Sequence, residues 1–432
     1  LRLESRLPGY PIYTVPMAFK ISGPFDAALF EQSLKAMVYR HEILRTGYKN
    51  VQERWTTTPT AAVNTAIEVE DWRIIDASQR DAFVDGMAAD DAWTAFDLTR
   101  DSPFRIRVLK FAEEEHVLLL TMHHIVMDAW TVRLILTELF SRYHALAEGA
   151  APPLTKPDLQ FYDFARWQNQ WRDGEAAREQ HAFWRGALQG ARSVFADAGA
   201  ARADGANFGT TSAPLHIGSE LVGELTAFSR RENGTLFITL LTALKFLLIS
   251  EFGGEDVSVA TPMANRSRPR TEGMVGLIEN TAVVRSVIAR DTPFRIALNI
   301  VRHAVLSAHA HQELPFEALL DALEADGDFD TGPLSELYFS VAGRIEADID
   351  LPGLKVEQVG ETLAETQSTL TFNNAKLMFI LKESEFGVIG KCVYKDSQFK
   401  EAEIEALVDR YEALLERLVA DPNLTPWATS RE

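Results

Sequence analysis

The pattern of apolar and polar residues between positions 104 and 143 predicts a strand, a second strand and then a helix. Residues 104–111 alternate apolar and basic side chains, a turn follows at 112–115, and Val117–Leu120 is a short, uninterrupted apolar run. This pattern indicates a hairpin whose second strand is buried on both faces. After Trp130, apolar residues recur at helical spacing as far as Tyr143, which predicts an amphipathic helix. The residues between the strand and the helix therefore lie at a corner, where rigid elements commonly position functional side chains.

The rest of the chain shows further helical and strand patterns in the same style. The other predicted elements are, in chain order, a helix over 26–39, a Trp-rich helical segment over 161–188, an exposed Ala/Gly-rich loop over 190–209, a helix from Glu220, a turn at Asn233-Gly234, a buried helix over 236–252, a strand over 257–261 and a terminal helix whose apolar face runs from Ile404 to Leu418. Mixed strands and helices in this order predict an α/β fold.

The length of the chain indicates two lobes rather than one. With 432 residues, the chain exceeds the size at which a single hydrophobic core usually keeps growing. We assign residues 1–175 to an N-terminal lobe and residues 176–432 to a C-terminal lobe, and we expect a cleft between them.

Composition and charge exclude several classes of protein. The net charge of −19 argues against nucleic-acid binding, which requires clustered cations. The longest apolar stretch, residues 236–249, contains Lys245 and is too short to span a bilayer, so we expect no membrane association. The single cysteine, Cys392, cannot form an internal disulfide and is expected to be a core residue. The first residues lack the features of a signal peptide, so we expect a cytoplasmic location. We also expect the domain to be monomeric.

The candidate chemistry lies in His123, His124 and Asp128, which form a His-His-x-x-x-Asp pattern at the predicted corner. Spacing alone leaves two other interpretations open, a pair of inert structural histidines or a metal site. Metal binding is disfavoured because adjacent residues of a strand point to opposite faces and no further Cys or His cluster supplies ligands. A histidine facing a cleft could move protons near neutral pH. Because no Ser or Cys nucleophile with elbow glycines lies nearby, direct transfer to an acceptor is favoured over a covalent intermediate.

Five segments, in this order along the chain, together resemble the condensation domains of nonribosomal peptide synthetases. These domains belong to the wider group of chloramphenicol-acetyltransferase-like His-His-x-x-x-Asp acyltransferases. The segments are Arg40-His-Glu-Ile-Leu-Arg-Thr46, Met122-His-His-Ile-Val-Met-Asp128, Phe161-Tyr-Asp-Phe-Ala-Arg-Trp167, Val275-Gly-Leu-Ile-Glu-Asn-Thr281 and His311-Gln-Glu-Leu-Pro-Phe-Glu317. One such motif is weak, whereas five in the family's order are specific.

The resemblance implies a fold and a division of roles. It implies two acetyltransferase-like α/β lobes that form a V-shaped pseudo-dimer with a central tunnel. By the same resemblance His124 is the catalytic residue, whereas His123 and Asp128 are architectural, and we take Arg285 as the candidate partner of Asp128. No metal and no cofactor is expected on the domain itself. The substrates would arrive on the phosphopantetheine arms of donor and acceptor carrier proteins.

The chain departs from the family pattern at two positions near these motifs. Ala129 follows the aspartate where the family usually has glycine, and Glu279 precedes Asn-Thr where the family typically has an apolar residue. Ala129 could narrow the tunnel or only fill a gap, and Glu279 could contact a polar acceptor or lie on the surface. Together with Trp130 and Asn280, these residues are the candidates for lining the tunnel.

The resemblance predicts an acyltransferase of nonribosomal peptide or hybrid polyketide biosynthesis, a part of secondary and antibiotic metabolism. The expected reaction moves a carrier-bound acyl or peptidyl group from its thioester onto an amine. Two alternatives stay open at this point: transfer onto a hydroxyl to form an ester, and a non-catalytic domain that only recruits other proteins. The intact His123-His124-x-x-x-Asp128 pattern disfavours the second alternative.

Overall fold

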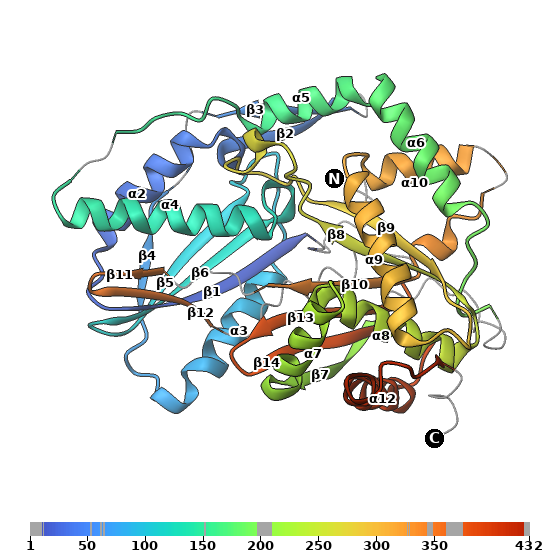
Figure 1. Cartoon of the computed structure of the whole chain (residues 1–432). Helices are drawn as coiled ribbons and strands as arrows, with labels where there is room; N and C mark the ends of the chain where they lie inside the picture. Colours follow the sequence, from blue (N-terminus) through green and yellow to red (C-terminus); the bar gives the residue numbers. More distant parts are fainter. Residues whose placement is uncertain are drawn as a thin grey trace. The chain divides into compact units, whose positions relative to one another are not determined.

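The chain forms two compact units, each with its own sheet (Figure 1). The computed structural model describes all residues except 1–10, 12, 52–53, 61–62, 64, 151–152, 197–209, 326, 328, 344–348, 360–374 and 427–432. The first unit comprises Leu1–Gln170, Arg266–Ile278 and Ile345–Thr371, and the second comprises the remaining segments.

The first unit is built on a six-stranded sheet with the order β11-β12-β1-β6-β5-β4. Its strands are β1 (Thr14–Ser22), β4 (Glu68–Asp71), β5 (Phe104–Ala112), β6 (Glu115–His123), β11 (Ile349–Leu351) and β12 (Leu354–Val359). All pairings are antiparallel except that of β4 with β5. A separate hairpin consists of β2 (Thr46–Val51) and β3 (Arg54–Pro59).

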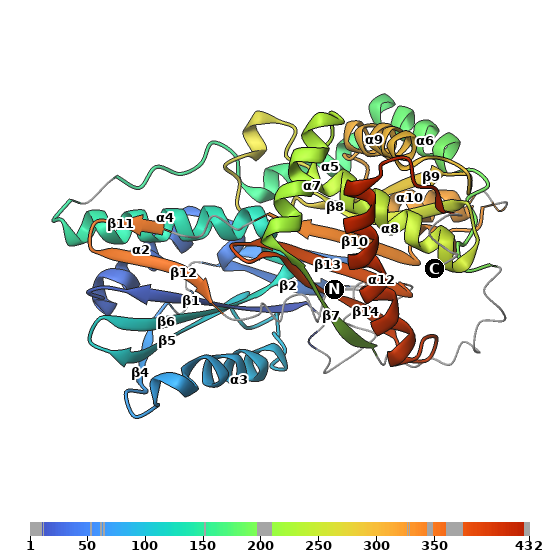
Figure 2. The same cartoon turned by 60° about the horizontal axis from the view of Figure 1, so that its bottom comes forward.

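Helices cover both faces of this sheet, which explains the uninterrupted apolar run of β6. The helices α2 (Ala27–Arg40) and α4 (Ala129–Ala147) lie on one face, and α3 (Arg80–Ala92) lies on the other (Figures 1 and 2). Leu118 and Leu120 of β6 belong to the core beneath α2 and α4, whereas Val117 and Leu119 belong to the core beneath α3. A strand buried on both faces needs no polar alternation.

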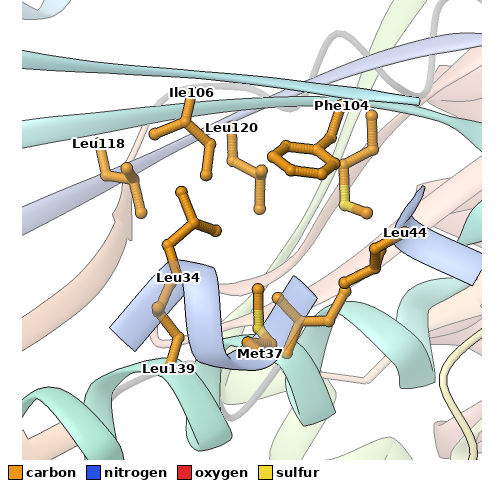
Figure 3. A pocket seen from close by; sticks show the side chains of 10 residues that line it. Leu34, Met37, Leu44, Phe104, Ile106, Leu118, Leu120 and Leu139 are labelled. Atoms are coloured by element: carbon orange, nitrogen blue, oxygen red, sulfur yellow. The ribbon is translucent and has the colours of Figure 1, made fainter. Parts of the chain in front are cut away.

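The core beneath α2 and α4 is closely packed around β6. Figure 3 shows leucine, methionine and phenylalanine side chains from α2, α4 and the strands pointing toward one another. They enclose a void of about 10 Å³. The void has room for about one water, but its walls offer no polar partner, so it is dry. The strand that leads into the histidine pair is therefore held by a rigid apolar support.

The second unit contains another six-stranded sheet, with the order β7-β14-β13-β10-β8-β9. Its strands are β7 (Thr210–Gly218), β8 (Asp256–Met263), β9 (Asn280–Val287), β10 (Leu337–Ala342), β13 (Leu377–Ser384) and β14 (Gly387–Lys395). One face is covered by α7 (Ser219–Arg231), α8 (Leu236–Phe252), α9 (Phe294–Ala310) and α12 (Glu401–Ala420). Two further helices, α6 (Glu175–Leu188) and α10 (Phe316–Ala325), complete the unit.

Most of the predicted elements are present in the structure. The predicted hairpin is β5 and β6, and the helix predicted after Trp130 is α4. The segment 161–188 differs, because it forms two helices, α5 (Phe161–Trp171) and α6, which are separated by a turn ending at Gly174. Cys392 is fully buried in the core of the second unit, as predicted. Most of the loop predicted at 190–209 lies outside the described residues.

The division of the chain differs from the prediction of one cut after residue 175. Two segments of the predicted C-terminal lobe, Arg266–Ile278 and Ile345–Thr371, belong to the first unit. The physical reason is pairing: β12 extends the first sheet by bonding to β1, and the segment that starts at Arg266 bonds to Asp128. Local periodicity carries no signal of such long-range pairing.

Within the described part of the chain, no single helix is long and apolar enough to cross a membrane. Only when α7 and α8 are taken together do they have the length and apolar composition of a membrane span, and these two helices are bent by 100° relative to each other.

Candidate active site

The histidine pair lies where β6 ends and α4 begins. His123 is the last residue of β6, a short 3₁₀ helix spans His124–Val126, and α4 starts at Ala129. The backbone N–H of His123 donates to the carbonyl of Pro103 at 2.8 Å, and that of His124 donates to the carbonyl of Tyr13 at 2.8 Å. These two hydrogen bonds fix the backbone of both histidines.

His123 has the environment of an architectural residue. Its side chain is 1% exposed and packs between the rings of Tyr13 and Phe96. Its Nδ1 accepts a hydrogen bond from the backbone N–H of Ile125 at 3.0 Å, which requires that Nδ1 carry no proton. This bond closes the turn that follows the strand, so the ring of His123 shapes the corner.

His124 has the properties of a proton acceptor. The residue is half-buried, and burial lowers the pKa of its imidazole below the ordinary value. The hydrogen bond to its own backbone carbonyl and the charge of Asp128 act in the opposite direction. A lowered pKa keeps the ring neutral at pH 7, and the neutral ring can take a proton from an attacking nucleophile.

Asp128 is a buried carboxylate that is held by donors from two segments, the start of α4 and the residues Arg266–Ile278. The residue is 2% exposed, and it caps α4 by accepting the N–H of Thr131 at 2.7 Å. Nη2 of Arg266 lies 3.0 Å from each of its carboxylate oxygens, and the N–H of Ile278 donates to it at 3.0 Å. A buried carboxylate with such partners serves to fix the structure rather than to move protons.

The segment Arg266–Ile278 forms a clamp over the start of α4, and we refer to it as the clamp. Nη1 of Arg266 donates to the carbonyls of Thr271 and Met274 at 2.6 and 2.7 Å, which folds the clamp around the guanidinium. The hydroxyl of Thr131 donates to the carbonyl of Gly276 at 2.8 Å. The indole N–H of Trp130 donates to the carbonyl of Glu272 at 2.8 Å. The clamp therefore fixes the first turn of α4, directly after the histidine pair.

Comparison with known proteins decides the family. A sequence model of the family described as Condensation domain matches residues 3–426. The chain belongs to the condensation-domain family. The resemblance inferred from the five motifs is confirmed, and so is the mixed α/β fold class.

Relatives of this condensation domain are much longer proteins. The chain is 32% identical over 98% of its length to one component of the linear gramicidin synthase of Brevibacillus parabrevis, and 30% identical over 97% to a second component of that synthase. It spans only 8% and 5% of these two proteins. The solved condensation domain of the Monacolin K polyketide synthase MokA has a TM-score of 0.80, with 98% of this chain and 96% of that chain covered. At 18% identity this last likeness concerns the fold alone.

The predicted pairing of Asp128 with Arg285 is wrong. Arg285 lies in β9 of the second unit, where its Nε and Nη2 bond to the carboxylate of Asp256 at 2.9 Å each. Its Nη1 bonds to the carbonyls of Ala187 and Gln189. Arg266 takes the role in this condensation domain. The sequence did not point to Arg266 because no local pattern marks this residue as buried, whereas its side chain is 2% exposed.

Two of the four candidate tunnel residues have side chains that form hydrogen bonds with backbone groups of the condensation domain. The indole of Trp130 binds the clamp and stacks with Arg133, whose guanidinium carbon lies 4.6 Å from the ring centroid. The side-chain amide of Asn280 donates to the carbonyls of Gln312 and Leu314 at 2.7 and 2.6 Å. Its Oδ1 accepts the N–H of Phe316 at the start of α10. Both side chains therefore have structural partners.

The other two candidates, Ala129 and Glu279, belong to different units. Ala129 is exposed at the first position of α4. Glu279 is half-buried in the second unit close to Tyr338, and burial together with the charge of Glu279 raises the pKa of that phenol. Among the residues that the structure describes, no group of three His, Cys, Asp or Glu side chains is placed to hold a metal ion.

Proposed function

We propose that this condensation domain joins a carrier-bound acyl or peptidyl group to an amine, with His124 as the catalytic residue. The observation that carries the proposal is the environment of His124, a half-buried imidazole of lowered pKa. The backbone on either side of it is fixed by the turn at His123 and the buried pair of Asp128 and Arg266. Fixed geometry matters because a displacement of about 1 Å can cost roughly 10²-fold in rate.

The proposed reaction is a direct transfer. The amine nitrogen attacks the thioester carbon, the C–N bond forms and the C–S bond breaks, and the thiolate leaves. His124 takes the proton that the amine loses and returns it to the departing thiolate, so no proton is gained or lost overall. General acid–base help of this kind typically contributes roughly 10²–10⁴ in rate.

The proposed substrates are carried by partner proteins. Family membership supports donor and acceptor carriers whose phosphopantetheine thiols bear the two substrates. The relatives, of which this chain spans less than a tenth, are large synthetases in which such carriers would be covalently linked. The domain itself is proposed to need no further cofactor, because the thioester already activates the acyl group.

The test is a transfer assay with loaded donor and acceptor carriers, followed by intact-protein mass spectrometry. His124→Ala should abolish the mass shift of the acceptor carrier, whereas the control His303→Ala, at an exposed position of α9, should retain it. Circular dichroism of both variants checks that they fold. Full turnover by folded His124→Ala would refute the catalytic assignment. Acceptors that carry a hydroxyl in place of the amine, tested in parallel, distinguish ester formation from amide formation.

A further inference from the structure

A cavity of about 210 Å³ lies in the first unit beside the histidine corner, and we refer to it as the side pocket. Its walls come from the β2–β3 hairpin, from the start of α5 and from the clamp. Ile125, the residue that follows His124, forms part of the wall, as does Leu277 of the clamp. Consecutive Cα atoms are about 3.8 Å apart, so the pocket wall begins within one residue of His124.

The shape of the side pocket follows from the local backbone. Strand alternation places Thr46 and Tyr48 on the same face of β2, and both line the pocket. Gly276 has a φ of 149°, and a side chain there would collide with the ring of Phe161. Glycine thus lets Phe161 pack directly on the clamp, so that Phe161 and Leu277 complete the apolar wall together.

Tyr48 supplies a polar group within this apolar wall. The residue is only 4% exposed, and burial raises the pKa of its phenol. In contrast to Thr46, whose hydroxyl donates to the carbonyl of Glu42 at 2.7 Å, the Tyr48 hydroxyl bonds to no group of the described residues. The hydroxyl is not one of the fully buried atoms that lack a partner, and Tyr48 lines the side pocket, so its hydroxyl is available to pair with a ligand group.

The volume restricts the class of ligand. Pockets for whole drug-sized molecules usually measure about 300–1,000 Å³. The side pocket, at about 210 Å³, is smaller and matches one large side chain rather than a whole substrate. The walls are mainly apolar, and their polar groups are the carboxylate of Glu42 and the hydroxyls of Thr46, Tyr48, Thr57 and Tyr162. Glu42 and Thr46 already have partners in Arg45 and the Glu42 carbonyl. Such walls suit an aromatic group that carries a hydrogen-bonding atom.

We propose that the side pocket receives the aromatic side chain of an aminoacyl substrate, and that Tyr48 bonds to a phenol or indole N–H at its tip. This inference rests on the proposed function. The substrate's reacting carbon or amine would lie beside His124 while its side chain extends past Ile125. Both the donor and the acceptor can be aminoacyl groups, so the experiment varies them separately.

The test is a competition assay with tyrosyl, phenylalanyl and alanyl substrates. Each is loaded first on the donor carrier against a glycyl acceptor, and then on the acceptor carrier against a glycyl donor. In one of the two arms, wild type should prefer tyrosyl to phenylalanyl substrate. Tyr48→Phe should lower that preference about three- to tenfold, as expected for one lost hydrogen bond. The control Tyr39→Phe, at a 57% exposed position of α2, should leave it unchanged.

Two variants test the volume of the side pocket. Ala165→Phe on α5 and Thr57→Phe on β3 fill the cavity from different walls. Either should lower the rates with both aromatic substrates at least tenfold and leave the alanyl rate nearly unchanged. The exposed position of Thr57 keeps this test available if the α5 variant does not fold.

The outcomes separate this inference from the proposed function. A wild-type domain that transfers none of the substrates contradicts the proposed function itself. The side-pocket inference alone is overturned if an active wild type has a tyrosyl-to-phenylalanyl preference that Tyr48→Phe leaves unchanged and aromatic-to-alanyl ratios that the folded filling variants leave unchanged. The arm in which the ratios change identifies the donor or the acceptor as the occupant.

Discussion

The buried pair of Asp128 and Arg266 allows a quantitative test of the site's architecture. The perturbations are Asp128→Asn and Arg266→Met, which keep the approximate volume of each side chain and remove its charge. Both side chains are 2% exposed, so either single variant leaves a buried group without its counter-charge. Breaking a buried pair in this way typically costs about 3–5 kcal/mol.

The double variant should cost much less than the sum of the single variants. When both charges are absent, no buried charge is left without a counter-charge, and a methionine beside an asparagine fills the same space as the original pair. We expect a coupling free energy of about 2–3 kcal/mol between positions 128 and 266, which is the upper part of the range for residues in contact. For positions 128 and 285, whose side chains bond to different partners, we expect less than about 0.5 kcal/mol.

The assay is equilibrium urea unfolding followed by tryptophan fluorescence. Trp130 of α4 is one of the eight tryptophans and contributes a signal from this region, because its indole N–H donates to the carbonyl of Glu272 in the clamp. A chain of two units can unfold in more than one transition, so each transition is fitted separately. Asp256→Asn with Arg285→Met is the matched control pair, since these residues bond to each other in the second unit.

Two results would refute the reasoning. The first is a coupling free energy below about 0.5 kcal/mol between positions 128 and 266, which would mean that the pair does not hold the clamp. The second is strong coupling between positions 128 and 285, which would restore the partner that the sequence suggested.

Three further outcomes are expected. Since burial lowers the pKa of His124, transfer should be lost on acidification with a midpoint below 6.5, and an acid limb centred above 6.5 in the rate profile would contradict the proton-acceptor role. Burial lowers the pKa of Lys245 to about 7, so between pH 7 and about 10 the unfolded chain binds more protons than the folded chain does. The free energy of unfolding should therefore rise by a few kcal/mol over this pH range. Lys245→Met should remove this rise in urea titrations, and an identical rise in the variant would exclude Lys245 as its cause. Gly276→Ala forces the clamp away from Phe161 and should lower thermal stability and the transfer rate together. The control Gly223→Ala on α7, where the added methyl meets nothing, should raise thermal stability slightly and leave the transfer rate unchanged. Unchanged stability of the Gly276 variant would show that the close packing is dispensable.

Elements with strong local periodicity could be predicted from the sequence. The strand through Leu118 and the helix after Trp130 were predictable because apolar spacing alone distinguishes the two. The corner between them was predictable for the same reason, and with it the location of His123 and His124.

Pairings across the sequence could not be predicted. Asp128 and Arg266 are 138 positions apart, and no local pattern distinguishes Arg266 from Arg285 as the partner. The contacts of Asn280 were missed for a similar reason, since it bonds to backbone carbonyls, which leave no trace in side-chain identity. Tyr48 was missed because its significance depends on a missing partner and a cavity, and both exist only after folding.

The return of β12 to the first sheet has a consequence for how the chain matures on the ribosome. Until β12 emerges, β1 lacks its outer neighbour and has an open edge that other chains can pair with. That strand follows residue 170 by roughly 190 residues, which corresponds to about 10–40 s of synthesis. The first half of the chain must therefore wait for the second before it is complete, and truncated or separately expressed halves should aggregate rather than fold.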